Sequence, residues 1–417
     1  MEKILRNSKI LDRGWFIKVL TQGRKNLISL AGQEWKTRRR LVAPSFDNSI
    51  LKTKFVPTIV DRTIDLCQRL EGIDGQPIRD IIGEHVLSIV LETTLGLVDV
   101  DLKKIEMIHR KTRDWVISLG KIPSKPQLLI DLLFQMIAEF FNHPSDSKII
   151  NDYVKEIIEQ RSAERYSSNN NSDTIVSNGK TRLAFLDHMI HHLIESGDNK
   201  SAKLSAQDLV DETMSVIING FDTVTSTITY VLYNLAKDPV IQEKFYQERR
   251  REMHLLLCQS NDSEIEIGKL DCYPLLTQCI KESLRLQCTT SGTSRTSKDS
   301  IEIGGYVIPK NAFITVRIHT IHHDDNVFPV PEKFDPSRFS TENMAKIPPG
   351  AFVPFGDGPR RCLGERLALL EMHIILGRIL SKFQVNLIDN EKTMVKYTLI
   401  NSIFNQQPKF KFVNRDL

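Results

Sequence analysis

Cys362 stands at the end of a loop rich in glycine and proline, immediately before a segment, Gly364–Leu380, that is predicted to be helical. Gly356 and Gly358 permit backbone conformations that a side chain would block. The unpaired N–H groups at the start of a helix favour a nearby thiolate. Three neighbouring arginines are expected to act in the same direction: Arg360, Arg361 and Arg366. A thiolate held in this way is a strong electron donor to a metal.

The residue type of Cys362 is compatible with four kinds of chemistry. A lone cysteine is most often a buried structural thiol. A nucleophile needs a histidine base; none lies within ten residues of Cys362, although a partner distant in the sequence could be close in the fold. Zinc is weakly supported because the chain has no C-x-x-C pair. The fourth kind is an axial thiolate ligand of haem iron.

The run Phe355–Gly364 has the pattern F-G-x-G-x-R-x-C-x-G, which resembles the haem-binding loop of the cytochrome P450 family. The resemblance implies that Cys362 is the axial ligand of the iron in haem b, with Phe355 and Arg360 as further haem-binding residues. It also implies a fold that is mainly α-helical with a small β region, in which one large domain surrounds the haem.

Glu282-Ser283-Leu284-Arg285 places an acid and a base three residues apart, on one face of a predicted helix. Apolar neighbours indicate that the pair is buried and needs further partners. The segment Pro331–Phe339 resembles the family's F-x-P-x-R-F stretch, and the resemblance adds Arg338 to a structural network with Glu282 and Arg285 behind the haem. The expected role of this network is to hold the loop that carries Cys362.

Trp35-Lys36-Thr37-Arg38-Arg39 has the pattern W-x-x-x-R, whose first and last residues share one face of a helix. By itself the pattern also fits an ordinary basic amphipathic helix. The resemblance makes Trp35 and Arg39 ligands of a haem propionate, together with Arg295 and Arg360. Buried carboxylates need such partners because an unpaired buried charge is costly.

Residues 206–237 are predicted to form one long helix, which starts after the N-cap residue Ser205 and ends before Pro239. At about 1.5 Å per residue, roughly 32 residues span about 48 Å, enough to cross a whole domain. In the middle of this helix, the run Asn219–Val224 resembles the family's A/G-G-x-D/E-T-T/S motif on the oxygen side of the haem.

Asp222 and Thr223 form an acid–alcohol pair, to which the resemblance assigns catalytic delivery of protons to bound dioxygen. Gly220 costs about 1 kcal/mol relative to alanine inside a helix, and is expected to let the flat haem approach the backbone. Two residues depart from the motif. Asn219 cannot form the ester to haem that a glutamate forms at this position in one related clan, so a non-covalent haem is expected. Val224 leaves Thr223 as the only hydroxyl of the motif, so proton delivery could be altered.

The chain has 417 residues, a net charge of +4 and six scattered cysteines. The mild charge gives no indication of nucleic-acid binding, and the sparse cysteines fit a reducing compartment. Motifs from Trp35 to Cys362 predict one domain over residues 1–417. Residues 166–181 are polar and are predicted to be a disordered loop within it. The three histidines of Ile318–Asp325 invite interpretation as a metal site, but the family has a similar turn at this point.

Apolar residues recur with helical periodicity along most of the chain. Further helices are predicted over Gly32–Val42, Lys54–Glu71, Gly83–Leu95, Lys103–Leu119, Gln127–Phe141, Ser147–Arg165, Leu183–Ser196, Val240–Leu257 and Leu275–Leu286. A hairpin is predicted where two glycines separate Ser300–Ile303 from Tyr306–Ile308, followed by an extended run over Ala312–Ile318.

No run of about 18 apolar residues predicts a transmembrane helix, and the first residues do not read as a signal peptide. The resemblance implies a place at the cytosolic face of the endoplasmic reticulum membrane for full-length members of the family. Those members have a longer segment before W-x-x-x-R, so the chain is expected to lack the usual N-terminal anchor and first elements. Gln127–Phe141 fits a core helix and a peripheral membrane contact equally well.

The resemblance implies a haem-thiolate monooxygenase that inserts one atom of dioxygen into a small apolar substrate, with electrons from NADPH through a reductase. Arg38, Arg39 and Arg40, with the arginines beside Cys362, could form a basic face for an acidic electron donor. The segment Asn26–Phe46 resembles the clan that includes fatty-acid omega-hydroxylases, which favours fatty acids or other lipids as substrates. Two alternatives stay open: a haem-thiolate isomerase or dehydratase, and a degenerate non-catalytic haem-binding protein.

Overall fold

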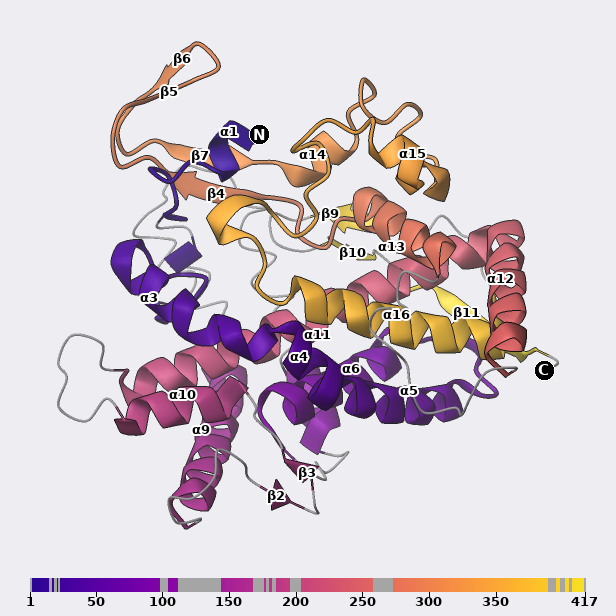
Figure 1. The fold of residues 1–417 in the computed structure, drawn as a ribbon, viewed down its shortest axis with the longest axis horizontal. Coiled ribbons are helices and arrows are strands. Elements are labelled where there is room, and N and C mark those ends of the chain that lie inside the picture. Colours follow the sequence, from indigo (N-terminus) through magenta and orange to yellow (C-terminus); the bar gives the residue numbers. More distant parts are fainter. Residues whose placement is uncertain are drawn as a thin grey trace.

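The computed structural model describes residues 2–14, 17–18, 21, 23–97, 104–111, 144–167, 176–177, 180–181, 185–195, 204–257, 273–388, 395–397, 402–404 and 407–415. The fold is mainly α-helical with a small β region, as the sequence predicts (Figure 1). Within these residues, no helix combines the length and the apolar character needed to cross a membrane.

The longest helix, α11 (Ala206–Lys237), crosses the molecule and has the predicted bounds. A capping box fixes its start. The Ser205 hydroxyl accepts a hydrogen bond from the Asp208 amide at 3.0 Å, and the Asp208 carboxylate accepts one from the Ser205 amide at 2.9 Å. The helix ends at Lys237, and Pro239 then begins α12 (Pro239–Leu257), because proline is favoured in the first turn of a helix.

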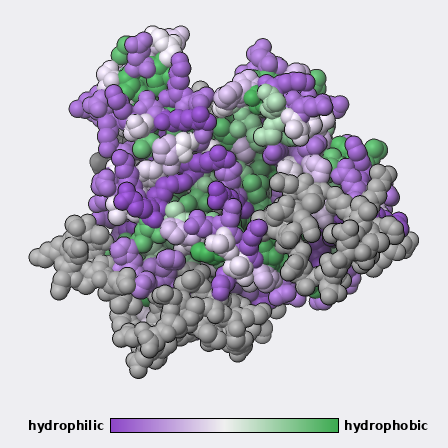
Figure 2. Space-filling view, viewed as in Figure 1, coloured by the Kyte–Doolittle hydropathy of each residue, from purple (hydrophilic) through white to green (hydrophobic). Residues whose placement is uncertain are grey.

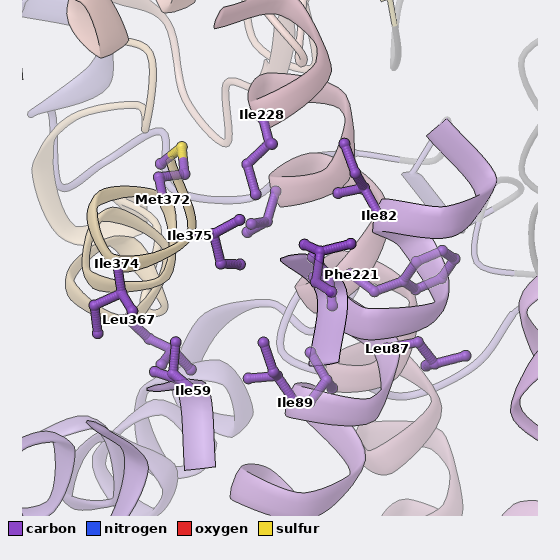
Figure 3. Close-up of a cluster of buried hydrophobic side chains, with 14 of the residues drawn as sticks. Ile59, Ile82, Leu87, Ile89, Phe221, Ile228, Leu367, Met372, Ile374 and Ile375 are labelled. Atoms are coloured by element: carbon purple, nitrogen blue, oxygen red, sulfur yellow. The ribbon is translucent and has the colours of Figure 1, made fainter. Parts of the chain in front are cut away.

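The hydrophobic core joins α11 to three other helices: α5 (Val56–Leu70), α6 (Arg79–Thr94) and α16 (Glu365–Lys382). Figure 3 shows aliphatic side chains of these helices converging with Phe221 and Met372 in one cluster. Because protein interiors are close-packed, the helices that carry the candidate site are held rigidly relative to one another.

The remaining helices surround this core. They are α1 (Glu2–Leu5), α3 (Gly32–Val42), α4 (Asn48–Ile50), α9 (Pro144–Ser167), α10 (Phe185–Glu195), α13 (Pro274–Leu286), α14 (Ile318–His322) and α15 (Thr341–Met344). Of these, α3, α9, α10 and α13 follow predicted ranges to within three residues, whereas the short α1, α4, α14 and α15 were not predicted. Short 3-10 turns cover Ala43–Phe46, Pro336–Phe339 and Gly358–Arg360, and a π-helical turn over Leu51–Phe55 precedes α5.

The β region consists of one three-stranded sheet and four two-stranded ones among the described residues. The predicted hairpin is present as β5 (Ile301–Ile303) and β6 (Tyr306–Ile308), and β4 (Thr293–Thr296) pairs with β7 (Phe313–Val316). The sequence did not predict the three-stranded sheet of β1 (Asp74–Pro77), β11 (Lys409–Asn414) and β8 (Phe383–Leu387), which joins distant parts of the chain, nor the pair β9 (Val395–Tyr397) and β10 (Ser402–Phe404).

Six residues of the predicted disordered loop 166–181 lie in described elements. Residues 166–167 continue α9, and β2 (Val176–Ser177) pairs antiparallel with β3 (Lys180–Thr181). The disorder of the rest of this segment stays a prediction. The candidate membrane-contact helix Gln127–Phe141 lies outside the described residues, as does most of Lys103–Leu119, of which residues 104–111 are helical.

Candidate active site

The loop that carries Cys362 is a compact turn held by backbone hydrogen bonds. The Gly356 amide donates to the Val353 carbonyl at 2.9 Å, and the Cys362 amide donates to the Phe355 carbonyl at 2.9 Å. Gly358 has a φ of 68°, which L side chains rarely adopt, and a β-carbon there would overlap the carbonyl oxygen of Leu5. The glycine pattern therefore serves both the turn and the close approach of the N-terminal segment.

Cys362 precedes α16, whose N-cap is Gly364 without a side-chain cap. The cysteine side chain is exposed, whereas Cys67, Cys279 and Cys288 are buried. Although Cys362 is exposed at the surface, loss of solvation around its sulfur is the main effect on its pKa and raises it, while the Gly364 N–H and the positive charges of Arg13 and Arg39 lower it. The helix start therefore acts in the expected direction, but desolvation of the sulfur exceeds its effect.

The predicted acidic–basic network is present and completely buried at its centre. Arg285 donates from Nε to Glu282 at 2.7 Å and from Nη2 at 2.8 Å, and both side chains have no exposed area. Arg338 lies 3.4 Å from the same carboxylate, and the Asp335 amide donates to it at 2.8 Å. Burial raises the pKa of Glu282 and the two arginines oppose this. The network joins α13 to the segment that precedes the cysteine loop.

Arg360 stacks on Trp35, with 4.0 Å from its Cζ to the indole ring. Its three nitrogens also donate to backbone carbonyls, and these belong to Leu11, Leu27 and Leu30. Arg360 therefore clamps the N-terminal segment onto the cysteine loop. A role for Arg360 as a propionate ligand stays a prediction. It would use the N–H groups of Arg360 that take no part in these three bonds.

A group of four arginines provides a test of whether the site fits haem: Arg13, Arg39, Arg295 and Arg360. The Nε atoms of Arg13 and Arg295 are buried and have no hydrogen-bond partner in the described part of the chain. Burial and the charge of Arg13 lower the pKa of Arg295 to about 10, and burial with Arg13 and Arg295 lowers that of Arg360 to about 9. Asp12 acts on this group from 4.0 Å, its distance to Arg360, but it lies closer to Lys298, at 2.8 Å.

This surplus of buried positive charge fits a ligand with carboxylates, as haem propionates are. Trp35 and Arg39 lie at the same place: Trp35 is buried, and Arg39 donates to the Arg361 carbonyl at 2.9 Å. The sequence missed Arg13 because it belongs to no motif, and its only signal was a basic residue before a glycine.

The oxygen-side helix α11 has one accessible window in its middle. Between Leu209 and Leu235 all but five residues are buried, and those five are Val216, Ile218, Asn219, Gly220 and Thr223. Most of them share one helical face, since they are spaced by three or four residues. The Thr223 hydroxyl donates to the Asn219 carbonyl at 2.8 Å, and the Asn219 amide nitrogen donates to the Ser215 carbonyl at 2.7 Å. Side-chain oxygens are thereby left as acceptors in an otherwise apolar window.

Asp222 lies on the buried side of α11, away from this window. Arg79 of α6 donates from Nη2 to the Asp222 carboxylate at 2.6 Å and to the Ser226 hydroxyl at 3.1 Å. The acid and the alcohol of the predicted pair are therefore adjacent in the chain but differ in exposure. Val224 is also buried, so a hydroxyl at that position would not reach the window in any case.

Gly220 has a packing reason that the sequence did not indicate. A β-carbon there would lie 3.0 Å from Cγ2 of Val90 on α6. The glycine therefore lets α6 approach α11 closely. Its predicted contact with haem stays a prediction.

The predicted basic face is smaller than expected. Arg38 is buried and paired with Glu212 at 3.0 Å, and Arg360 is buried as described above. Arg361 is paired with Glu365, whereas Arg40 and Arg366 are exposed. Figure 2 shows one face of the molecule, on which hydrophilic side chains prevail and hydrophobic ones are exposed in the middle and near the upper and right edges. In the described residues, no group of histidines, cysteines and acids forms a metal cluster, His319, His322 and His323 included.

Comparison with known proteins identifies relatives over nearly the whole chain. The family model described as cytochrome P450 matches residues 6–413. The chain is 27% identical to cytochrome P450 4c21 of Blattella germanica, over 96% of this chain and 80% of that protein. It is 30% identical to human cytochrome P450 4F3 and to leukotriene-B4 omega-hydroxylase 3 of Mus musculus, in each case over 86% of this chain and 68% of the relative.

A solved structure has the same fold. A retinoic acid-bound cyanobacterial CYP120A1 superposes with a TM-score of 0.78, covering 99% of this chain and 86% of its own, at 20% sequence identity. At this identity the likeness concerns the fold alone.

Proposed function

The chain belongs to the cytochrome P450 family, and from this premise we propose that it hydroxylates a fatty acid or another lipid, with Cys362 as the axial ligand of its haem. Enzymes of this family are haem-thiolate monooxygenases that incorporate molecular oxygen, and they bind haem b through a cysteine. The observation that carries the proposal is the exposed Cys362 beside Arg13 and Arg295, whose buried Nε atoms lack acceptors among the described residues.

When bound, the haem supplies the activation of dioxygen. The protein supplies position and charge. Cys362 would be held by the turn between Val353 and Gly364, and the propionates would be held by Arg13, Arg39 and Arg295, with Trp35 and the remaining donors of Arg360 beside them. Arg295 and Arg360 are buried, and Arg13 and Arg39 are partly buried. Since their charges act on one another, an anion at this place would relieve their mutual repulsion.

Thr223 and Asp222 are proposed to deliver protons on the oxygen side. The Thr223 oxygen faces the window and can accept a hydrogen bond from water or substrate. Asp222 is anchored by Arg79, so a proton that reaches the window from this carboxylate must pass from the buried side of α11 to Thr223. The apolar Val216 and Ile218 would line the substrate side and exclude water.

A lipid substrate is supported by the name of one relative, leukotriene-B4 omega-hydroxylase 3, and by the resemblance of Asn26–Phe46 to the omega-hydroxylase clan. An NADPH-dependent reductase is the proposed electron donor, because members of the family receive electrons from such partners. The exposed Arg40 and Arg366 would then contribute to its docking. We place the enzyme at the cytosolic face of the endoplasmic reticulum, with a peripheral membrane contact.

One purified preparation tests these proposals in order. Reduced protein under carbon monoxide should give the thiolate-shifted absorption band, and Cys362→Ala should remove it. Turnover with NADPH, a reductase and a series of fatty acids should then give hydroxylated products. A wild-type protein without the band contradicts haem-thiolate ligation. A band without NADPH-dependent turnover, but with conversion of lipid peroxides, would instead identify an isomerase or dehydratase.

A further inference from the structure

His322, the last residue of α14, is completely buried and makes a hydrogen bond that its sequence motif does not indicate. Its ring Nε2 lies 3.0 Å from the backbone nitrogen of Val353. A backbone N–H can only donate, so Nε2 is the acceptor and the ring proton is assigned to Nδ1. Burial is the main reason that the pKa of His322 is lowered to about 3, with His319, His323 and Arg285 acting in the same direction. The ring is therefore neutral and keeps its acceptor at neutral pH.

The backbone of the same residue is tied to the buried network. The His322 carbonyl accepts a hydrogen bond from Nη1 of Arg285 at 3.0 Å. One residue thus contacts the Glu282–Arg285–Arg338 network through its backbone and the start of the cysteine loop through its ring. Arg338 instead donates to the Pro329 carbonyl at 2.7 Å, and the Asp335 amide donates to Glu282, so these contacts connect the network to residues 329–338.

Hydrogen bonds continue from Val353 to the cysteine. The Val353 carbonyl accepts from Gly356, and the next residue but one, Phe355, accepts from the Cys362 amide. The Val353 side chain is buried with Leu5, Val316 and Ile318, so both its backbone and its side chain are fixed. The His322 ring also lies 5.2 Å from the ring of Phe352.

We propose that His322 is a positioning residue for Cys362: its ring fixes the first residue of the loop, and thereby the place of the sulfur. It touches no reacting atom and acts through Val353. The use of the sulfur as a haem ligand rests on the proposed function, but the fixing of the loop does not. Without the acceptor, the buried Val353 N–H has no partner and the loop opens more often.

Three variants separate the hydrogen bond from packing. His322→Leu fills the space without an acceptor. His322→Gln keeps an acceptor at about the distance of Nε2. His323→Gln is the matched control, because the neighbouring histidine bonds to the His319 carbonyl of its own helix. Should His322→Leu fail to fold, His322→Asn carries the same prediction, since its amide ends at the position of Nδ1.

Two readouts are needed. Hydrogen exchange of the peptide containing Val353, measured without haem, should be about ten- to a hundredfold faster in His322→Leu than in wild type. In His322→Gln and His323→Gln it should be close to wild type. With haem, the fraction of carbonyl complex in the thiolate-ligated form should fall in His322→Leu only, at unchanged helical content. Unchanged exchange in His322→Leu would overturn the proposal, and so would equal losses in His322→Leu and His322→Gln. A wild type without the thiolate-shifted band would refute the proposed function while leaving the exchange test intact.

Discussion

The two sides of the candidate site are built differently. On the cysteine side, the groups that hold the loop have protein partners: Cys362 through its amide, Arg360 through three carbonyls and the supporting Arg285 through the Glu282 carboxylate. The buried Nε atoms of Arg13 and Arg295 differ from them, since they have no partner among the described residues. On the oxygen side, α11 offers an accessible window in which Asn219 and Thr223 use their donors within the helix. Many contacts fix the geometry of the cysteine side, whereas a few accessible groups define the oxygen side.

This difference separates two requirements of the same enzyme. Holding a thiolate ligand needs fixed geometry. Buried charge networks and strained glycines provide it, and such sites tolerate substitutions poorly. Binding a substrate and passing protons needs accessible groups whose hydrogen bonds can rearrange. Substitutions on the cysteine side should therefore act first on stability, and substitutions in the window first on turnover.

Removal of the buried negative charge on the cysteine side should have the largest effect on stability. Glu282→Gln leaves Arg285 and Arg338 without a carboxylate in a site with no solvent, so the free energy of unfolding should fall by about 3–5 kcal/mol. Denaturant unfolding followed by circular dichroism measures this. Glu342→Gln, on the exposed part of α15, is the control and should change little. An equal change in the free energy of unfolding of Glu282→Gln and Glu342→Gln would contradict the expected sensitivity of the cysteine side.

Loss of the window hydroxyl should affect turnover and not stability. Thr223→Val should lower the rate of coupled product formation by about a hundredfold, because general acid–base groups contribute on this order, while unfolding stays within about 0.5 kcal/mol. Product formed per NADPH consumed is the measurement. Val224→Thr restores the hydroxyl of the family pattern at a buried position, and should leave coupling unchanged. Improved coupling in Val224→Thr would contradict the conclusion that position 224 does not reach the accessible window.

One buried acid on the cysteine side also has an atom without a hydrogen-bond partner among the described residues. Glu371 of α16 is buried, its Oε1 has no hydrogen-bond partner in the described residues, and burial raises its pKa to about 8. Between pH 4.5 and 8 the unfolded chain loses this proton and the folded chain keeps it, so stability is lost as pH rises.

Glu371→Gln should remove that dependence. The free energy of unfolding at pH 7, measured relative to its value at pH 4.5, should then be about 1–3 kcal/mol higher in the variant than in wild type. Unfolding curves at several pH values give the comparison. Glu342→Gln again serves as the control, and parallel pH curves for wild type and Glu371→Gln would show that this carboxyl ionises normally in the folded protein.

The sequence predicts much of this contrast, for reasons that are local. The bounds of α3 and α11 follow from helical periodicity, a capping residue and proline, which act within a few positions. In the sheet of β1, β11 and β8, the pairing of β1 with β11 joins residues more than 300 positions apart, and nothing within these three short strands indicates such pairing. In the site, Cys362 and Glu282 belong to spaced motifs, whereas Arg13, Arg79 and His322 acquire their contacts only in the folded chain.

The smallest expected effect concerns the helix contact beneath the window. In Gly220→Ala the new β-carbon meets Val90 at 3.0 Å, a distance at which the neighbour must shift, so the helix-propensity gain of about 1 kcal/mol should be cancelled or reversed. Gly377→Ala in α16 is the matched variant, because its β-carbon lies 3.8 Å from Leu276 and should stabilise by up to about 1 kcal/mol. Paired thermal unfolding curves measure the difference. A gain at both glycines would mean that α6 yields easily to α11, and that Gly220 is needed on the window side of the helix instead.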